Sequence, residues 1–168
     1  MRNFILFSAV LLILCTVGAG KDAKMTLTSP AFKQGEAIPA KYTADGADIS
    51  PPLKIENVPD GTKALVLIVD DPDAPHGTWD HWIVYGIPVT AEIAENSVPG
   101  TQGKNSFRKL NYGGPAPPSG THRYFFKLYA LDVKLGLPEG KTKKEVEKAM
   151  KGHVIDKAEL MGTYSRRK

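Results

Sequence analysis

The distribution of hydrophobic positions predicts a domain built mainly from β-strands. Residues 64–69 form a continuous apolar, β-branched run, which is typical of a central strand covered on both faces. Residues 25–29 alternate between apolar and polar side chains, as in a strand with one buried face. Two segments rich in aromatic and β-branched residues, 81–87 and 122–131, are also expected to be strands, and 158–164 is expected to be the last.

One helix is predicted near the C-terminus. Thr142 can cap its first turn, and Glu145 follows three residues later, which is the spacing of a capping box. Gly152 is expected to end it. The residues spaced to form one apolar stripe along this helix are Val146, Ala149 and Met150. Prolines and glycines divide the rest of the chain into short segments, and residues 45–53 are expected to be loop. The sequence therefore predicts an all-β-dominated β-sandwich with one clear helix.

The first residues have the layout of a secretory signal peptide. Arg2 precedes an unbroken run of apolar or small residues, 4–17, and small residues follow at 18–20. An uncleaved membrane anchor would need about 20 apolar residues, and this run is shorter. We therefore divide the chain into a signal peptide, residues 1–20, and one ligand-binding domain, residues 21–168, which is exported to the periplasm or secreted.

Length, cysteine content and charge exclude several other classes of protein. The 168 residues suit one domain that can bury a core without disulfides or metals. Cys15, the only cysteine, lies inside the apolar run, so the mature chain would have no thiol. Lipidation at Cys15 is disfavoured because Leu14 stands where a lipoprotein signal has a small residue. The net charge of +4 is too modest to indicate nucleic-acid binding, and a solvated surface explains it.

Carboxylates and imidazoles gather around the ends of the predicted strands. Asp71 ends the buried strand and Asp73 follows two residues later, so in extended backbone both carboxylates would point the same way. His81 and His122 each open a strand after a short loop. If these strands share a sheet with alternating directions, the four side chains meet at one rim. Each residue alone can be explained by turn chemistry or a structural hydrogen bond, so it is their coincidence that indicates a site.

Three kinds of chemistry compete for this rim. In the first, the carboxylates accept hydrogen bonds from the imidazoles, which then donate to a phosphate-sized anion, and the nearby negative charge should raise the histidine pKa. In the second, the two aspartates and two histidines bind zinc or manganese, although no helical histidine spacing supports this. In the third, Ser119 forms a hydrolytic triad with His122 and an aspartate, without the Gly-x-Ser-x-Gly elbow. The anion pocket, without metal or cofactor, is favoured.

Several motifs in this region resemble the phosphatidylethanolamine-binding protein family, also called Raf kinase inhibitor-like proteins. The resemblance extends from about residue 25 to residue 166. The matching segments are ISPPL at 49–53, DDPDAP at 70–75, HWIV at 81–84, IP at 87–88, YGGPAPP at 112–118 and GTHRYFFKLY at 120–129.

The resemblance implies a sandwich of antiparallel sheets with an anion pocket. The corresponding residues are Asp71, Asp73, His81, Gly114, Pro115 and His122, with Trp79, Trp82 and Tyr124 as walls or supports. It also implies a cis bond between Ala74 and Pro75. Some eukaryotic members inhibit kinases or a serine carboxypeptidase. The compact 73–81 loop and the early C-terminus of this chain instead resemble the short bacterial or archaeal branch.

We therefore expect an exported, non-enzymatic binding protein whose ligand is a small anion or a phosphorylated or phospholipid head group. The alternative is an inhibitor or regulator of a partner protein, a protease or kinase, that uses the rim of the pocket. A hydrolase is third. A protein partner and a homodimer are left open, and no nucleic-acid partner is expected.

Overall fold

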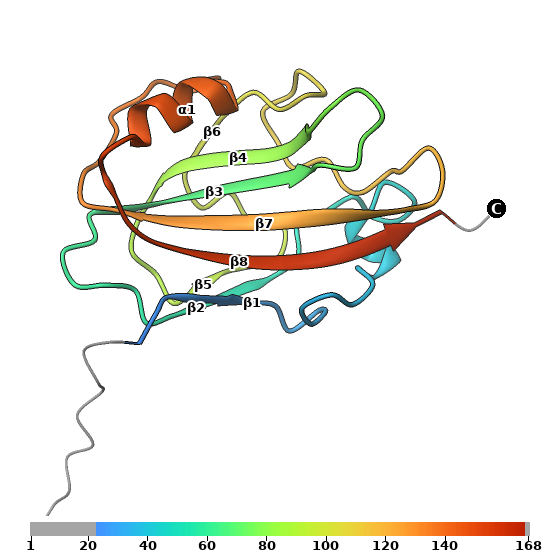
Figure 1. The fold of residues 1–168 in the computed structure, drawn as a ribbon, viewed down its shortest axis with the longest axis horizontal. Helices are drawn as coiled ribbons and strands as arrows, with labels where there is room; N and C mark the ends of the chain where they lie inside the picture. The colour runs from blue at the N-terminus through green and yellow to red at the C-terminus, as the bar shows by residue number, and fades with distance from the viewer. Residues whose placement is uncertain (1–22, 167–168) are drawn as a thin grey trace, which may run out of the picture.

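Two antiparallel β-sheets form the frame of the protein, seen in a computed structural model that describes residues 23–166 (Figure 1). The larger sheet has the strand order β6-β4-β3-β7-β8, and the smaller has the order β1-β2-β5. The strands are β1 (Thr26–Thr28), β2 (Leu53–Glu56), β3 (Ala64–Asp71), β4 (Trp79–Ile87), β5 (Glu92–Ile93), β6 (Thr101–Gln102), β7 (Thr121–Leu131) and β8 (Val154–Ser165). The predicted β-dominated sandwich is confirmed.

The central strand β3 explains the continuous apolar run. It pairs with β4 on one side and β7 on the other, and every one of its residues is buried. Alternation along the strand divides its side chains between two cores. Leu65, Leu67 and Val69 pack between the two sheets. Val66 and Ile68 belong to a second cluster on the opposite face of the larger sheet.

That opposite face is covered at one end by the helix α1 (Lys143–Met150), as Figure 1 shows. The predicted capping box is present: Thr142 accepts a hydrogen bond from the Glu145 backbone, and the Glu145 carboxylate accepts one from the Thr142 N–H at 2.9 Å. Val146 and Met150 point into the second core. The helix is therefore held by its first-turn cap and by its apolar stripe.

The observed element boundaries differ from the predicted ones at several places. β4 begins at Trp79 rather than at residue 81, and β8 begins at Val154 rather than at residue 158. Leu53 begins β2 although the segment 45–53 is predicted as loop. β2, β5 and β6 have only two to four residues each, too few for periodicity to reveal them. A short 3-10 helix, η1 (Ala40–Tyr42), lies between β1 and β2.

The expected cis bond between Ala74 and Pro75 is wrong, because the described residues contain no cis peptide bond. Other contacts reverse the chain after β3. The backbone N–H of Asp73 donates to the Asp71 carboxylate at 2.8 Å, which forms an Asx turn. Gly77 then donates its N–H to the Ala74 carbonyl and adopts a φ of 97°, a conformation open to glycine.

The predicted signal peptide and Cys15 lie outside the described residues. Within residues 23–166, no helix is long and apolar enough to cross a membrane.

Replacing Thr142 with alanine tests how much the cap contributes to the fold. The variant loses the side-chain half of the capping box, and we expect its free energy of unfolding to fall by about 1 kcal/mol. Urea denaturation of both proteins measures the difference. Lys144→Ala, at an exposed position of the same helix, is the control. Equal losses in the two variants would show that the cap adds nothing beyond general helix propensity.

Candidate functional site

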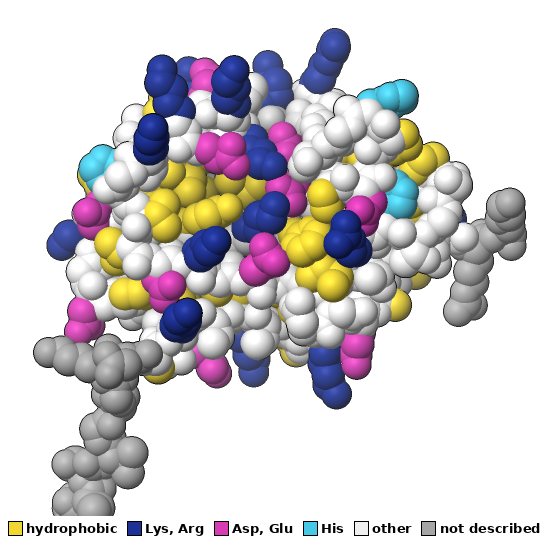
Figure 2. Space-filling model, viewed as in Figure 1, with side chains coloured by type: hydrophobic (Ala, Val, Ile, Leu, Met, Phe, Trp, Pro, Cys, Tyr) yellow, Lys and Arg dark blue, Asp and Glu magenta, His cyan; other side chains and the backbone are white. Residues whose placement is uncertain are grey.

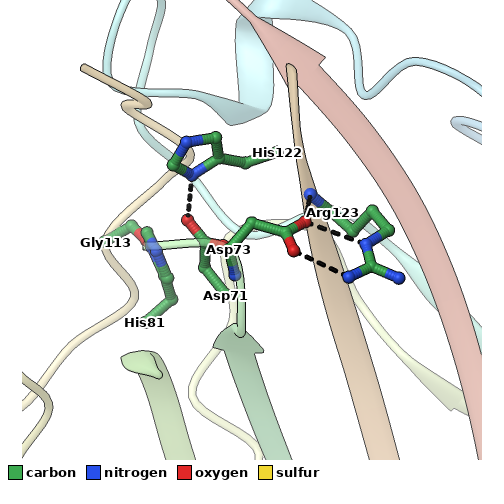
Figure 3. A network of polar contacts seen from close by, with 6 residues as sticks. All are labelled: Asp71, Asp73, His81, Gly113, His122 and Arg123. Carbon is green, nitrogen blue, oxygen red and sulfur yellow. Dashed lines mark hydrogen bonds and ion pairs between the residues drawn. The ribbon is translucent and has the colours of Figure 1, made fainter. Parts of the chain in front are cut away.

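The antiparallel order β4-β3-β7 brings three of the predicted site residues to one rim of the larger sheet (Figure 3). Asp71 is the last residue of β3 and pairs in register with Trp79 at the start of β4. His81 lies two residues further along β4, and His122 is the second residue of β7. All three side chains are buried, although they lie at strand ends. The predicted meeting of Asp71, His81 and His122 is confirmed.

These residues border a cavity of about 380 Å³. Its lining combines five polar or ionisable side chains with a larger apolar wall. The polar members are Asp71, His76, His81, His122 and Tyr124, and the others are Ala74, Pro75, Trp79, Phe107, Ala116, Pro117 and Pro118. The cavity can therefore offer hydrogen bonds to one part of a ligand and apolar contact to another.

The Asp71 carboxylate fixes the orientation of His122. Its Oδ2 lies 2.7 Å from His122 Nδ1, and its Oδ1 accepts the backbone N–H of Asp73. An ionised carboxylate can only accept, so Nδ1 of His122 carries the proton in this bond. The bond leaves Nε2 as the ring nitrogen available to a ligand.

His81 is oriented by a backbone carbonyl instead of an aspartate. Its Nδ1 lies 2.6 Å from the oxygen of Gly113, which requires Nδ1 to be the donor. Burial lowers the pKa of His81 and outweighs the opposing effects of the Gly113 carbonyl and the Asp71 charge. The expectation that a neighbouring aspartate raises the histidine pKa is therefore wrong at His81. The neutral ring presents an unprotonated Nε2.

Tyr124 adds a hydroxyl group to the same cavity. The residue is 1% exposed, and its hydroxyl lies near the Asp71 carboxylate and the Ala116 backbone. Burial, followed by the charge of Asp71, raises the pKa of Tyr124, so the hydroxyl keeps its proton. The ring meets His81 edge-on, with 5.2 Å between centroids. Tyr124 lines the cavity and keeps its proton, so its hydroxyl is a candidate hydrogen-bond donor there.

The carboxylate of Asp73 does not point in the same direction as that of Asp71. Both of its oxygens contact the Arg123 guanidinium, at 2.7 and 2.8 Å, and one also accepts the Arg123 backbone N–H (Figure 3). The ion pair lowers the pKa of Asp73 to about 2. The expectation of parallel carboxylates is wrong because Asp73 lies in a turn, where strand alternation no longer applies.

Three further predicted residues lie next to the cavity without lining it. Trp82 is 1% exposed, packs in the main core and donates its indole N–H to Gln102 at 2.9 Å. Gly114 donates its N–H to the Asp48 carboxylate, and an added Cβ there would come within 2.7 Å of an oxygen of that group. The Pro115 carbonyl accepts a backbone hydrogen bond. These residues support the neighbouring backbone, whereas Trp79 lines the cavity itself.

Sequence reasoning missed two residues of the loop between β6 and β7. Phe107 is 39% exposed and packs edge-on against Trp79 and His81 at the cavity. Asn105 is 4% exposed and donates to the carbonyls of His81 and Asn111, which ties the loop to β4. Residues 103–111 of this loop have no periodicity or motif, and Phe107 is the only aromatic residue among them.

The other two chemistries predicted for the rim are not assembled by the described residues. They contain no group of three or more His, Cys, Asp or Glu side chains placed to hold a metal ion. The two aspartates of the proposed metal set face different partners, since Asp71 binds His122 and Asp73 binds Arg123. Ser119 is not among the residues that line the cavity.

Comparison with known proteins identifies relatives along most of the chain. The sequence model of the family described as phosphatidylethanolamine-binding protein matches residues 28–165. A UPF0098 protein of Pyrococcus horikoshii is 47% identical, with 97% of this chain and 88% of the relative covered. A UPF0098 protein of Aquifex aeolicus is 49% identical, with 98% and 95% covered.

Two solved structures share the fold. A protein of Chlamydia trachomatis described as a phosphatidylethanolamine-binding protein homologue superposes with a TM-score of 0.83 at 48% identity, over 86% of this chain and 99% of that one. YbcL of E. coli, described as a new member of the mammalian PEBP family, superposes with a TM-score of 0.80 at 29% identity, over 86% and 100%.

The ion pair beside the cavity predicts a pH-dependent contribution to stability. Because Arg123 holds the pKa of Asp73 near 2, below the ordinary value of 3.8, the pair stabilises the folded state above that ordinary value. The contribution is lost as the pH falls toward about 2. Arg123→Gln should therefore lower the thermal midpoint slightly at neutral pH, and the difference from the unmodified protein should shrink in acid.

Thermal unfolding at a series of pH values measures this difference. Lys54→Gln, at an exposed position on β2, is the matched control for loss of a positive charge. A destabilisation by Arg123→Gln that stays constant into the acid range would contradict the role of Asp73.

Proposed function

The chain belongs to the phosphatidylethanolamine-binding protein family, and from that premise we propose that it is a non-enzymatic protein that binds a small anion. The ligand is phosphate, or the phosphate group of a phosphorylated or phospholipid head group. The observation that carries this proposal is the convergence of three hydrogen-bonding groups on one cavity. Two are imidazoles whose Nδ1 atoms are already engaged, and the third is the protonated hydroxyl of Tyr124.

Each group is suited to an oxygen of the anion. The Tyr124 hydroxyl keeps its proton and donates without any change of ionisation. Nε2 of His81 donates once it gains a proton, and the charge of the bound anion favours that protonation. His122 offers its Nε2 to the same ligand while its Nδ1–H remains bound to Asp71. Anion binding should therefore be coupled to proton uptake.

The apolar wall supports an organic phosphate ester over the inorganic ion. Trp79 and Phe107 are each more than one third exposed and pack against each other with 5.4 Å between ring centroids. Together with Pro117 and Pro118 they offer apolar surface to a substituent on the phosphate. Free phosphate would leave this surface unused.

Binding is proposed in preference to hydrolysis. The Asp71–His122 pair resembles two members of a hydrolytic triad, but a triad also needs a nucleophile within hydrogen-bond reach of the histidine. The cavity lining contains no serine, threonine or cysteine. The described residues therefore support a binding role.

A titration with glycerophosphoethanolamine tests the pocket. This phosphodiester does not change its charge between pH 5 and 8, so any pH dependence comes from the protein. Affinity should rise as the pH falls, because the anion binds best when Nε2 of His81 is protonated. His81→Gln should weaken binding by about ten- to hundredfold at the acid end and flatten the pH dependence.

Calorimetric titration in the presence of a chelator measures both effects. His153→Gln replaces an exposed histidine far from the cavity and should bind like the unmodified protein. Affinity that is independent of pH, or unchanged by His81→Gln, would show that the imidazoles are structural.

Export of the mature chain is a separate part of the proposal. The apolar run at residues 4–17 and the small residues that follow support it. We expect N-terminal sequencing of the protein from its native source to find a first residue near Gly20 or Lys21. Recovery of intact chains that begin at Met1 in the cytosol would contradict export, and a membrane-bound chain that begins at Cys15 would favour lipidation.

A further inference from the structure

Two carboxylates face each other on the side of the larger sheet opposite the main core. Asp70 of β3 and Asp80 of β4 are partners in register, at the base of the hairpin that links the two strands. The Asp70 side chain has no exposed area, and that of Asp80 is 22% exposed. Like charges directly opposite each other destabilise a strand pair, and low exposure removes the screening by water. This strand pair therefore needs a compensating positive charge.

Lys143 supplies that charge to both carboxylates. Its Nζ lies 2.6 Å from an oxygen of Asp70 and 3.3 Å from an oxygen of Asp80. Lys127 approaches Asp70 at 2.8 Å. Among the ion pairs of the described residues, only that of Lys143 reaches Asp80. On the face drawn in Figure 2, charged side chains of both signs lie between two hydrophobic patches.

Helix formation does not account for a lysine at this position. Lys143 is the first residue of α1, where the positive end of the helix dipole disfavours a cation. Its side chain is only 19% exposed, whereas Lys144 beside it lies in solvent. Partial burial of an ammonium group is costly without paired acids. The two carboxylates are therefore the reason that this lysine turns toward the sheet.

The carboxylates are directly connected to the cavity. Asp71 follows Asp70 in the chain, while Trp79 and His81 flank Asp80. The backbone of Asp80 also exchanges two hydrogen bonds with Ser106, both at 2.9 Å, and Ser106 precedes Phe107. Displacement of Asp80 would therefore move Trp79, His81 and Phe107, which all line the cavity.

We propose that Lys143 is a positioning residue of the cavity, which bridges Asp70 and Asp80, balances their charges together with Lys127, and so fixes the base of the β3–β4 hairpin. The hairpin in turn holds Asp71, Trp79 and His81 in place on the other side. The effect on ligand affinity rests on the proposed anion-binding function. The effect on the hairpin does not depend on any ligand.

The test compares Lys143→Met with Lys143→Arg and with the double variant Lys143→Met/Asp80→Asn. Lys143→Met should lower the affinity for glycerophosphoethanolamine by roughly fivefold or more and speed amide hydrogen exchange of residues 71–81. Lys143→Arg keeps the charge and should restore both properties. The double variant removes one of the two negative charges that face each other, so it should also restore affinity and slow exchange. Lys144→Met, which changes the exposed neighbour, is the control.

The outcomes separate this proposal from the proposed function. If the unmodified protein does not bind glycerophosphoethanolamine, the anion-binding function fails, and hydrogen exchange of the hairpin still decides the role of Lys143. Binding and exchange in Lys143→Met equal to those of the unmodified protein would overturn the proposal. Failure of the Asp80→Asn change to restore them would also overturn it, since the effect would then not arise from charge. If Lys143→Met does not fold, recovery of a folded, binding-competent chain by the second substitution supports the proposal, and no recovery overturns it.

Discussion

The hydrogen bond between Asp71 and His122 is the interaction on which the cavity depends. It joins the end of β3 to the beginning of β7, which are separated by 51 positions in the chain, over 2.7 Å. A carboxylate this deeply buried is tolerated only when its oxygens are hydrogen-bonded, and both are, to His122 and to the Asp73 backbone. The second bond also forms the turn that follows β3. One side chain thus sets the tautomer of an imidazole and the path of the hairpin.

The position of this carboxylate follows from the alternation of side chains along β3. Asp70 and Asp71 are adjacent, so they point to opposite faces of the sheet. Asp71 faces the cavity, while Asp70 faces Lys127 and Lys143 on the helix side. The strand β3 therefore ends in two charged residues whose side chains lie on opposite faces of the larger sheet. A shift of β3 by one residue would exchange these groups and place both in the wrong surroundings.

The sequence predicts those features that depend on local periodicity. The buried run at 64–69, the capping box at Thr142 and the common rim of Asp71, His81 and His122 all follow from spacing and strand direction. Alternation along β4 also excludes Trp82 from the cavity. Its neighbour His81 faces the cavity, and adjacent side chains of a strand point to opposite faces of the sheet. The ion pair of Asp73 with Arg123 could not be predicted, because it depends on a turn rather than a strand. Phe107 and Asn105 could not be predicted because long-range hydrogen bonds between the Asn105 and Ser106 side chains and the β4 backbone place their loop.

The cavity is also where the fold departs from the rules that stabilise the rest of the molecule. In the main core, apolar side chains pack against each other, and the indole of Trp82 has its hydrogen bond. At the cavity, burial disfavours the charged form of His81, although the ring lies beside the charge of Asp71. A bound anion would favour the charged imidazole and so offset part of this effect of burial. Such local departures are expected at functional sites, which gives the binding role a physical basis independent of the family resemblance.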